Sequence, residues 1–397
     1  MSIDLVSVVK TLLPFVTPLV TAVAKSTATW LSKKFGDKIK AGKLEQDLIK
    51  AVDKGRIEDF IKEYKKYLSE EDIKRIRAIA GLRDLFDKAK RILESKKYTI
   101  DAANTFTDLA KTLEDVTTGI SFEEAGIKAI NVLDSEVNEE IAVTSEEYIV
   151  ALLLRFAAVV WTQLAMKLTP SMEGWALEYD ASIKVVLAPP TLALNRAMAA
   201  EAKEERDDEA KKAVMGGSEF LKFRGDYLSL MQFYREGIAI RNQYLEAVSC
   251  LKTAQLKVRV VQGKQKIHKH MTPSHLDGLV SGFRGEAQFW QFNISENLPQ
   301  LAETVINFYN NNQQGTKKYL QEHLEVSKEE FNEFLDCLNL YQNTRDGFAG
   351  ALKLYKYAAE KCTPGKDMDM IQGRIVETQK RASNNPKVLV PDSKPIL

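Results

Sequence analysis

The longest apolar run in the chain extends from Tyr148 to Leu168 and limits what the chain can fold into. A helix that is apolar on nearly all sides is either the buried central helix of a bundle or a membrane span. The run is long enough to cross the roughly 30 Å of a bilayer core. However, Arg155 lies near its middle, where a charge costs roughly 2.5–3.5 kcal/mol in lipid. We therefore expect a central helix of a soluble bundle, with a later encounter with lipid as the alternative.

The ends and the polar face of this helix follow from the same stretch. Thr144 and Glu147 have the spacing of a capping box, which predicts a helix start. Pro170 predicts its end, because proline has no amide donor. Four polar residues fall on one narrow stripe at about 100° per residue: Arg155, Thr162, Gln163 and Lys167. Because an isolated buried charge costs several kcal/mol, we expect Arg155 to find an acidic partner, plausibly from residues 101–147, or several backbone carbonyls.

A second apolar run, Val185 to Ala200, is broken by Pro189 and Pro190. The β-branched residues before the prolines predict a short strand or extended edge, and the residues after them predict a helix start. The two runs together predict a mid-chain apolar hairpin, although two ordinary core helices explain them as well. The candidates for membrane insertion are its large apolar residues, namely Leu152, Leu153, Leu154, Val159, Val160, Trp161, Val185, Val186, Leu187, Leu192 and Leu194.

The first third of the chain predicts smaller helices. Residues 1–32 have helical apolar spacing, and Pro14 and Pro18 predict a kink or two short helices. This segment is expected either to dock on the core or to enter a membrane surface, and it makes a poor secretory signal. Residues 33–143 predict a subdomain of small helices, with capping patterns at Ser69 and at Ser121.

The second half predicts longer helices. After a break at Gly216 and Gly217, residues 218–261 predict one helix about 65 Å long, suited to a stem packed on a partner helix. The predicted divisions of the chain are 1–32, 33–143, 144–262, a hinge loop at 263–285, C-terminal helices at 286–383 and a loose tail at 384–397. Within the C-terminal part we expect one helix over 286–325, kinked at Pro299, and another from a capping box at Ser327 and Glu330 to about Lys361.

Charge is balanced overall but uneven along the chain. The net charge is +1, so no global field indicates nucleic acid. Residues 25–100 carry 21 Lys and Arg against 13 Asp and Glu, whereas residues 101–181 carry 4 against 15. These blocks are expected to pair within the fold, or alternatively to steer a partner. The three cysteines are too few and scattered for a disulfide framework.

Three of the four histidines, His268, His270 and His275, cluster in one basic stretch. The expected structure is a plain solvent loop, with a pH-responsive loop and a zinc site as alternatives. The zinc alternative lacks a nearby cysteine, and its carboxylate, Asp277, is not at a known ligand spacing. No phosphate-binding loop, nucleophile elbow or dinucleotide motif occurs, so we expect no enzyme, no cofactor and no metal site.

The sequence as a whole predicts an all-α, elongated bundle with long stem helices, a mid-chain apolar hairpin and a smaller N-terminal helical subdomain. In layout, over roughly residues 1–320, it resembles helical pore-forming toxins of the cytolysin A type. That resemblance implies a soluble form that changes conformation, forms a homo-oligomer and permeabilises a lipid membrane. The receptor is unknown, and no nucleic-acid partner is expected. A soluble helical scaffold that mediates protein–protein interactions is the alternative function.

Overall fold

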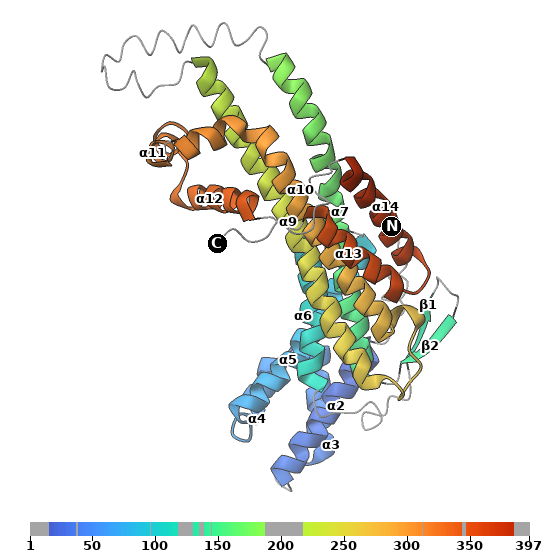
Figure 1. Ribbon diagram of the computed structural model, residues 1–397. Helices are drawn as coiled ribbons and strands as arrows, with labels where there is room; N and C mark the ends of the chain where they lie inside the picture. The colour runs from blue at the N-terminus through green and yellow to red at the C-terminus, as the bar shows by residue number, and fades with distance from the viewer. Residues whose placement is uncertain are drawn as a thin grey trace, which may run out of the picture. The chain divides into compact units, whose positions relative to one another are not determined.

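The computed structural model describes residues 16–36, 39–95, 97–117, 130–134, 139–143, 145–186, 217–311, 313–343 and 347–384. In these ranges the secondary structure is helical apart from one pair of short strands, with turns and short connections between the helices, so the predicted helical class is confirmed (Figure 1). Contacts divide the chain into two compact units. Unit 1 comprises Met1–Leu164, Leu245–Arg284 and Leu354–Val376, and unit 2 comprises Ala165–Tyr244, Gly285–Lys353 and Glu377–Leu397. Because the units combine distant segments, they do not test the contiguous divisions predicted from the sequence.

The described residues of the N-terminal part of unit 1 form five helices. They are α2 (Val16–Phe35), α3 (Ala41–Asp53), α4 (Ile57–Tyr64), α5 (Glu70–Ser95) and α6 (Ile100–Thr117). Helix α2 packs against α3 and α5, and α5 packs along α6. The predicted alternative of two short helices is wrong at Pro18, since α2 is continuous from Val16, whereas Pro14 lies outside the described residues. Pro18 is tolerated because amides in the first helical turn have no intrahelical partner to lose.

The predicted cap at Ser69 is confirmed at the start of α5. The Ser69 amide donates to Asp72 Oδ2 over 2.7 Å, and the Asp72 amide donates to Ser69 Oγ over 3.3 Å. Asp72 also pairs with Lys34 of α2 at 2.7 Å. One buried carboxylate therefore both begins α5 and ties it to α2.

The expected helical continuation of residues 101–143 is wrong at residues 130–134 and 139–143, whereas residues 118–129 and 135–138 lie outside the described residues. Two strands form an antiparallel pair, β1 (Ile130–Asp134) and β2 (Glu139–Val143). Ile130 lies opposite Val143, and Val132 lies opposite Ile141. These β-branched residues recur at every second position, which favours a strand over a helix. The capping pattern at Ser121 falls outside the described residues.

Helix α7 (Glu146–Val186) contains the first apolar run and is 41 residues long. The predicted end at Pro170 is wrong, because the helix continues through it. The extended segment predicted around Val185 is wrong for the same reason. A proline removes one backbone hydrogen bond, at about 3 kcal/mol, and a long helix retains the rest of its ladder. Thr144 and the predicted second arm of the hairpin, within residues 187–216, lie outside the described residues.

Helix α9 (Gly217–Val261) confirms the long stem helix predicted over 218–261. It packs on another long helix, α10 (Pro273–Asn311). In unit 1 Gln255 Nε2 donates to the Pro273 carbonyl over 3.0 Å, and in unit 2 Arg241 Nε donates to Gln291 Oε1 over 3.2 Å. Both parts of the predicted stem, its length and its long partner, are therefore confirmed.

The predicted hinge loop over 263–285 is too long. The non-helical connection ends at Thr272 and includes a short 3-10 turn, η4 (Lys269–Met271). Helix α10 then begins at Pro273, a residue whose fixed φ suits a first helical position. The His275 amide donates to Thr272 Oγ1 over 3.2 Å, which caps this helix start. Thr272 and Pro273 were therefore signals of a helix start rather than of a loop.

The remaining helices are α11 (Gln313–His323), α12 (Lys328–Asn343), α13 (Gly347–Lys361) and α14 (Lys366–Asn384). The capping box at Ser327 and Glu330 is confirmed, since each amide donates to the other side chain over 3.1 Å. The single helix predicted to Lys361 is wrong, because α12 ends at Asn343 and α13 begins at Gly347. Asparagine and glycine both favour helix ends over helix interiors. Pro299 lies inside α10, and most of the predicted tail lies outside the described residues.

Candidate functional site

The apolar segment of α7, as far as Leu164, is part of the core of unit 1. All six large apolar candidates in its first half are buried, namely Leu152, Leu153, Leu154, Val159, Val160 and Trp161. Phe156 packs edge-on against Phe106 of α6, with ring centroids 4.4 Å apart. Val185 and Val186 are helical, whereas Leu187, Leu192 and Leu194 are outside the described residues. The expected central helix is therefore confirmed for the first apolar run.

The predicted polar stripe divides into a buried and an exposed part. Arg155 and Thr162 are buried, Gln163 is partly buried and Lys167 is exposed. Thr162 Oγ1 donates to the Ala158 carbonyl over 2.8 Å, so its polarity is satisfied within the helix. Arg155 is therefore the residue of the stripe that needs a charged partner from elsewhere.

Asp367 of α14 is that partner. Arg155 Nη2 donates to Asp367 Oδ2 over 2.7 Å, and the two side chains are 3% and 8% exposed. The expected acidic partner is confirmed, but the expected source, residues 101–147, is wrong. Asp367 lies in the first turn of α14, where the helix dipole favours a carboxylate. The Arg155 guanidinium and the nearby histidines hold the pKa of Asp367 well below its usual range, despite the opposing effect of burial.

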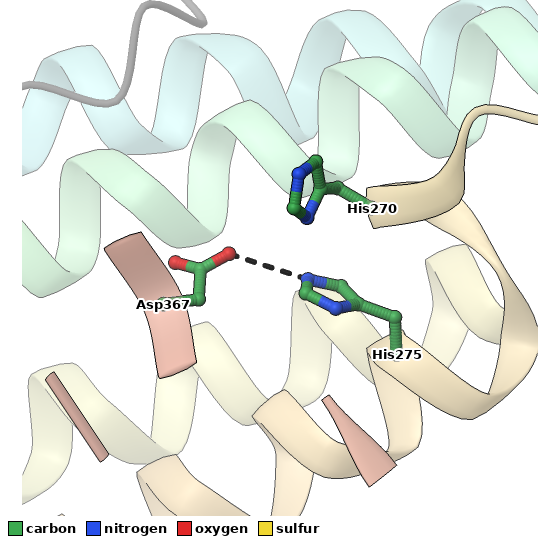
Figure 2. A group of neighbouring side chains, drawn as sticks. All are labelled: His270, His275 and Asp367. Atoms are coloured by element: carbon green, nitrogen blue, oxygen red, sulfur yellow. Dashed lines mark hydrogen bonds and ion pairs between the residues drawn. The ribbon is translucent and has the colours of Figure 1, made fainter. Parts of the chain in front are cut away.

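His275 is fully buried beside the same carboxylate (Figure 2). Its Nδ1 accepts a hydrogen bond from the Thr363 amide over 2.9 Å. The proton of the neutral ring is therefore on Nε2, which lies 3.3 Å from Asp367 Oδ2 and donates to it. The cap at Thr272 places His275 in the first turn of α10. Two helix starts, those of α10 and α14, thus bring His275 and Asp367 together.

His270 completes the group, which we call the Arg155 cluster: Arg155, His270, His275 and Asp367. The ring centroid of His270 lies 5.0 Å from that of His275. Burial, followed by the charges of the neighbouring histidines, lowers the pKa of His270 to about 4, although Asp367 opposes this shift. A β-carbon on Gly365, whose φ is +150°, would lie 3.0 Å from His270 Cε1. The turn before α14 therefore approaches the imidazole closely.

The expected solvent loop around the histidines is wrong. His268 and His275 are buried, and Met271 between them is 3% exposed. The His268 amide donates to the Tyr148 hydroxyl over 3.0 Å, and the His270 amide donates to His268 Nδ1 over 3.3 Å. This segment is therefore anchored to α7. An apolar methionine within a basic stretch was the available signal of burial.

Three side chains of the cluster are close enough together to suggest a metal ion. The candidate ligand atoms of His270, His275 and Asp367 lie within 4.8 Å of one another. However, Arg155 already places a cation on Asp367, and the amide on Nδ1 keeps a proton on Nε2 of His275. A metal ligand must offer an unprotonated nitrogen. Both features oppose a cation at this position.

Cys362, which lies beside the Arg155 cluster, is not an activated nucleophile. Burial raises the pKa of Cys362 to about 12, so the thiol stays protonated at neutral pH. Its Sγ contacts the His275 carbonyl at 3.8 Å, whereas the His275 ring is occupied by Thr363 and Asp367. Among the described residues, no basic side chain is therefore placed to take a proton from the Cys362 thiol. The arrangement is that of a buried charge network.

The network is incompletely satisfied. Within the described part of the chain, Arg155 Nη1, His270 Nδ1 and Asp367 Oδ1 are buried and lack a hydrogen-bond partner. Most buried polar atoms in folded proteins have one. A partly satisfied buried network stabilises less than a complete one. The cluster thus fixes α7 in one position while contributing only modest net stability.

Comparison with protein families, with curated proteins and with solved structures finds no match. The resemblance in layout to cytolysin A-type toxins therefore stays a prediction. Among the helices that the structure describes, one has a stretch, Glu146–Leu168, that is long and apolar enough to cross a membrane. Most of this stretch is buried, and the core helix of a soluble protein meets the same criterion.

Proposed function

We propose that this protein binds lipid membranes and permeabilises them after a conformational change and oligomerisation. The observation that carries the proposal is the 23-residue stretch Glu146–Leu168, whose length and apolar character suit a bilayer crossing. Its large apolar side chains face the interior of the protein. In this proposal the described state is the soluble form, and the stretch becomes available to lipid after it leaves the core.

An inserted α7 must accommodate Arg155. A charge at the bilayer centre costs roughly 2.5–3.5 kcal/mol on insertion scales. Charged residues in spans therefore face a water-filled lumen or a neighbouring chain. Arg155 and Thr162 are seven residues apart and fall on one helix face. A homo-oligomer would keep that face away from lipid.

The basic N-terminal part of unit 1 supports a role in recruitment to anionic lipid. In the described part of residues 25–100, five ion pairs join Lys or Arg to Asp or Glu of the same range. Because each pair uses one basic and one acidic residue, the excess of basic residues there is unchanged. Trp30 is 40% exposed, and the cations of Lys34 and Arg75 lie 5.3 Å from its ring. Tryptophan favours the membrane interface, and each basic residue near an anionic surface contributes about 1 kcal/mol.

A soluble scaffold is the second candidate, and the burial of α7 favours it. The apolar side chains of the first run are already covered by protein, and Arg155 already has its counter-ion. Under this hypothesis the segment is a core helix and meets no lipid. The two functions make opposite predictions for vesicles.

Dye release from vesicles containing phosphatidylserine tests the proposal. The informative variant is Leu187→Glu, outside the described residues, next to the Pro189-Pro190 break in the sequence. A charge there should spare vesicle binding but abolish release, because inserting it costs kilocalories. Leu256→Glu is the matched control, since Leu256 on α9 is 59% exposed and accepts a charge in water. It should release dye like the natural protein.

Quenching by brominated lipids locates the inserting segment. Trp161 is 7% exposed in the soluble form, so it is shielded from a quencher there. A variant that retains Trp161 as its single tryptophan should lose fluorescence when vesicles are added, because insertion would bring the indole into contact with the brominated acyl chains. Absence of both release and quenching across pH and lipid composition would reject the membrane function and favour the scaffold. A Leu187→Glu variant that is helical by circular dichroism and releases dye undiminished would reject the hairpin as the permeabilising element.

A further inference from the structure

We propose that the Arg155 cluster is a pH-sensitive latch, which holds the apolar segment of α7 in unit 1 at neutral pH and releases it on acidification. The consequence for membranes rests on the proposed function, whereas the latch itself is a property of unit 1. The proposal stands on the position of the cluster in the fold, on its charge balance, and on the burial of Arg155, His275 and Asp367 beside a half-buried His270.

The position of the cluster suits a latch. It joins α7, which carries Arg155, to the turn and helix start that carry His270 and His275 and to the first turn of α14. Figure 2 shows the side chains of His270, His275 and Asp367 next to one another. Arg155 is the only charged residue between Tyr148 and Met166. Its bond to Asp367 thus ties the middle of the apolar segment to a residue 212 positions away. Tyr148, in the first turn of the same helix, accepts the His268 amide and strengthens this attachment.

The charges of the cluster balance only when both imidazoles are neutral. Arg155 and Asp367 then cancel each other within a buried environment. Among the described residues, the other titratable or charged groups beside them are His268 and Lys269 next to His270, and Cys362 before α14. Lys269 adds a positive charge, and the Cys362 thiol stays neutral. A proton on His270 would therefore add a second cation against a single carboxylate.

The direction of the pH effect follows from the pKa shifts of the imidazole and the carboxylate. The closed cluster holds the pKa of His270 at about 4, whereas an opened segment restores its ordinary value of 6.5. Between these values the open form binds a proton that the closed form does not, so acidification favours opening. The pKa of Asp367 is shifted below its usual range, so Asp367 remains ionised through this interval. His270 is thus the sensor, and Asp367 is the anchor.

The size of the effect can be stated as a fold-change. A shift from 6.5 to about 4 raises the opening constant about 30-fold between pH 7.4 and pH 5. The same linkage saturates near pH 4, where the closed form also takes up the proton. A latch that depended on Asp367 instead would open only below the ordinary carboxyl range. The pH interval therefore identifies the responsible group.

Hydrogen exchange of the full chain measures this opening directly. Peptides from residues 148–168 are compared at pH 7.4 and pH 5, after correction for the intrinsic pH dependence of exchange. We expect the opening constant to rise about 30-fold in the natural protein and to change much less in His270→Asn. His323→Asn is the matched control, because His323 in α11 is the fourth histidine and lies in unit 2. It should retain the full response.

Two outcomes would overturn the latch. One is an opening constant for residues 148–168 that does not rise at pH 5 in the natural protein. The other is a His270→Asn variant that is folded by circular dichroism and keeps the natural response. If that variant does not fold, the test uses the natural protein instead. The nitrogen NMR resonances of its four imidazoles are then followed as a function of pH. One imidazole must then titrate near pH 4, and four ordinary titrations would refute the latch.

Dye release under the same conditions separates the latch from the proposed function. Exchange that accelerates at pH 5 while vesicles remain intact supports the latch and rejects permeabilisation. Release that is equal at pH 7.4 and pH 5, with no acceleration of exchange, rejects the latch and leaves permeabilisation in place. Release that rises at pH 5 together with exchange, and is reduced in His270→Asn, supports both.

Discussion

Arg155 in unit 1 and Arg235 in unit 2 both bind carboxylates, but in opposite surroundings. Arg155 donates to Asp367 over 2.7 Å, and its side chain is 3% exposed. Arg235 makes four such bonds, three to Glu333 at 2.8–3.0 Å and one to Glu330 at 3.3 Å, and its side chain is 46% exposed. Water competes for the second arginine and not for the first. The environment of an ion pair, rather than its number of bonds, should therefore decide what its loss costs.

Arg155→Met should have the largest effect. Removing one partner of a buried pair leaves the other charge uncompensated, at a cost of about 3–5 kcal/mol. We expect a loss of that size in the free energy of unfolding, measured by urea denaturation at pH 7.4.

The double variant Arg155→Met with Asp367→Asn should recover most of that stability, because no buried charge is then left alone. The amide oxygen that the second substitution introduces can still accept a hydrogen bond from His275 Nε2. Losses that simply add in the double variant would show that the two residues do not act as a pair.

Acidification should destabilise unit 1 through His270. The pKa of His270 is lowered to about 4 in the folded state, against an ordinary 6.5. Stability therefore falls as pH decreases from 6.5 to 4, by no more than about 3 kcal/mol, and this contribution is complete above pH 6.5. Urea denaturation across this interval should show a smaller decline in His270→Asn. An equal decline in both proteins would assign the acid sensitivity to other groups.

Gly365→Ala should have an intermediate effect. The residue has a φ of +150°, which favours glycine, and a β-carbon there would lie 3.0 Å from His270 Cε1. We expect a loss of about 1–3 kcal/mol from backbone strain and crowding. Gly373→Ala is the matched control in α14, where an added β-carbon meets nothing within 4 Å. That change should be neutral or should stabilise by up to about 1 kcal/mol. Equal changes in stability for Gly365→Ala and Gly373→Ala would show that the close approach of the turn before α14 to His270 does not matter for stability.

The helices were largely predictable from the sequence because their signals are local. The capping residues of α5 and α12 and the apolar periodicity of α9 act within a few residues of each other. Prolines misled the prediction at α7, since a long helix retains most of its hydrogen bonds around one missing donor. The strands β1 and β2 were missed because their alternation of β-branched residues covers only five residues in each segment.

The candidate site was only half predictable. A lone arginine in an apolar helix demands a counter-ion, and that physical requirement predicted the acidic partner of Arg155. No local rule identifies Asp367, which is 212 residues away. The burial of His275 and the partial burial of His270 likewise depend on the approach of α14, which only the tertiary structure shows. Sequence reasoning thus found the unsatisfied group and not the groups that satisfy it.

Arg235→Met should have the smallest effect and complete the comparison. Exposed ion pairs contribute about 0–1 kcal/mol, because water solvates the separated charges and ordering long side chains costs entropy. We expect a loss below about 1 kcal/mol despite the four bonds. Raising NaCl from low to molar concentration should remove what difference there is, since salt screens exposed charges. The loss caused by Arg155→Met should persist under the same salt, because buried pairs are screened much less. A salt-insensitive loss above about 2 kcal/mol for Arg235→Met would show that bond number, and not burial, ranks the two arginines.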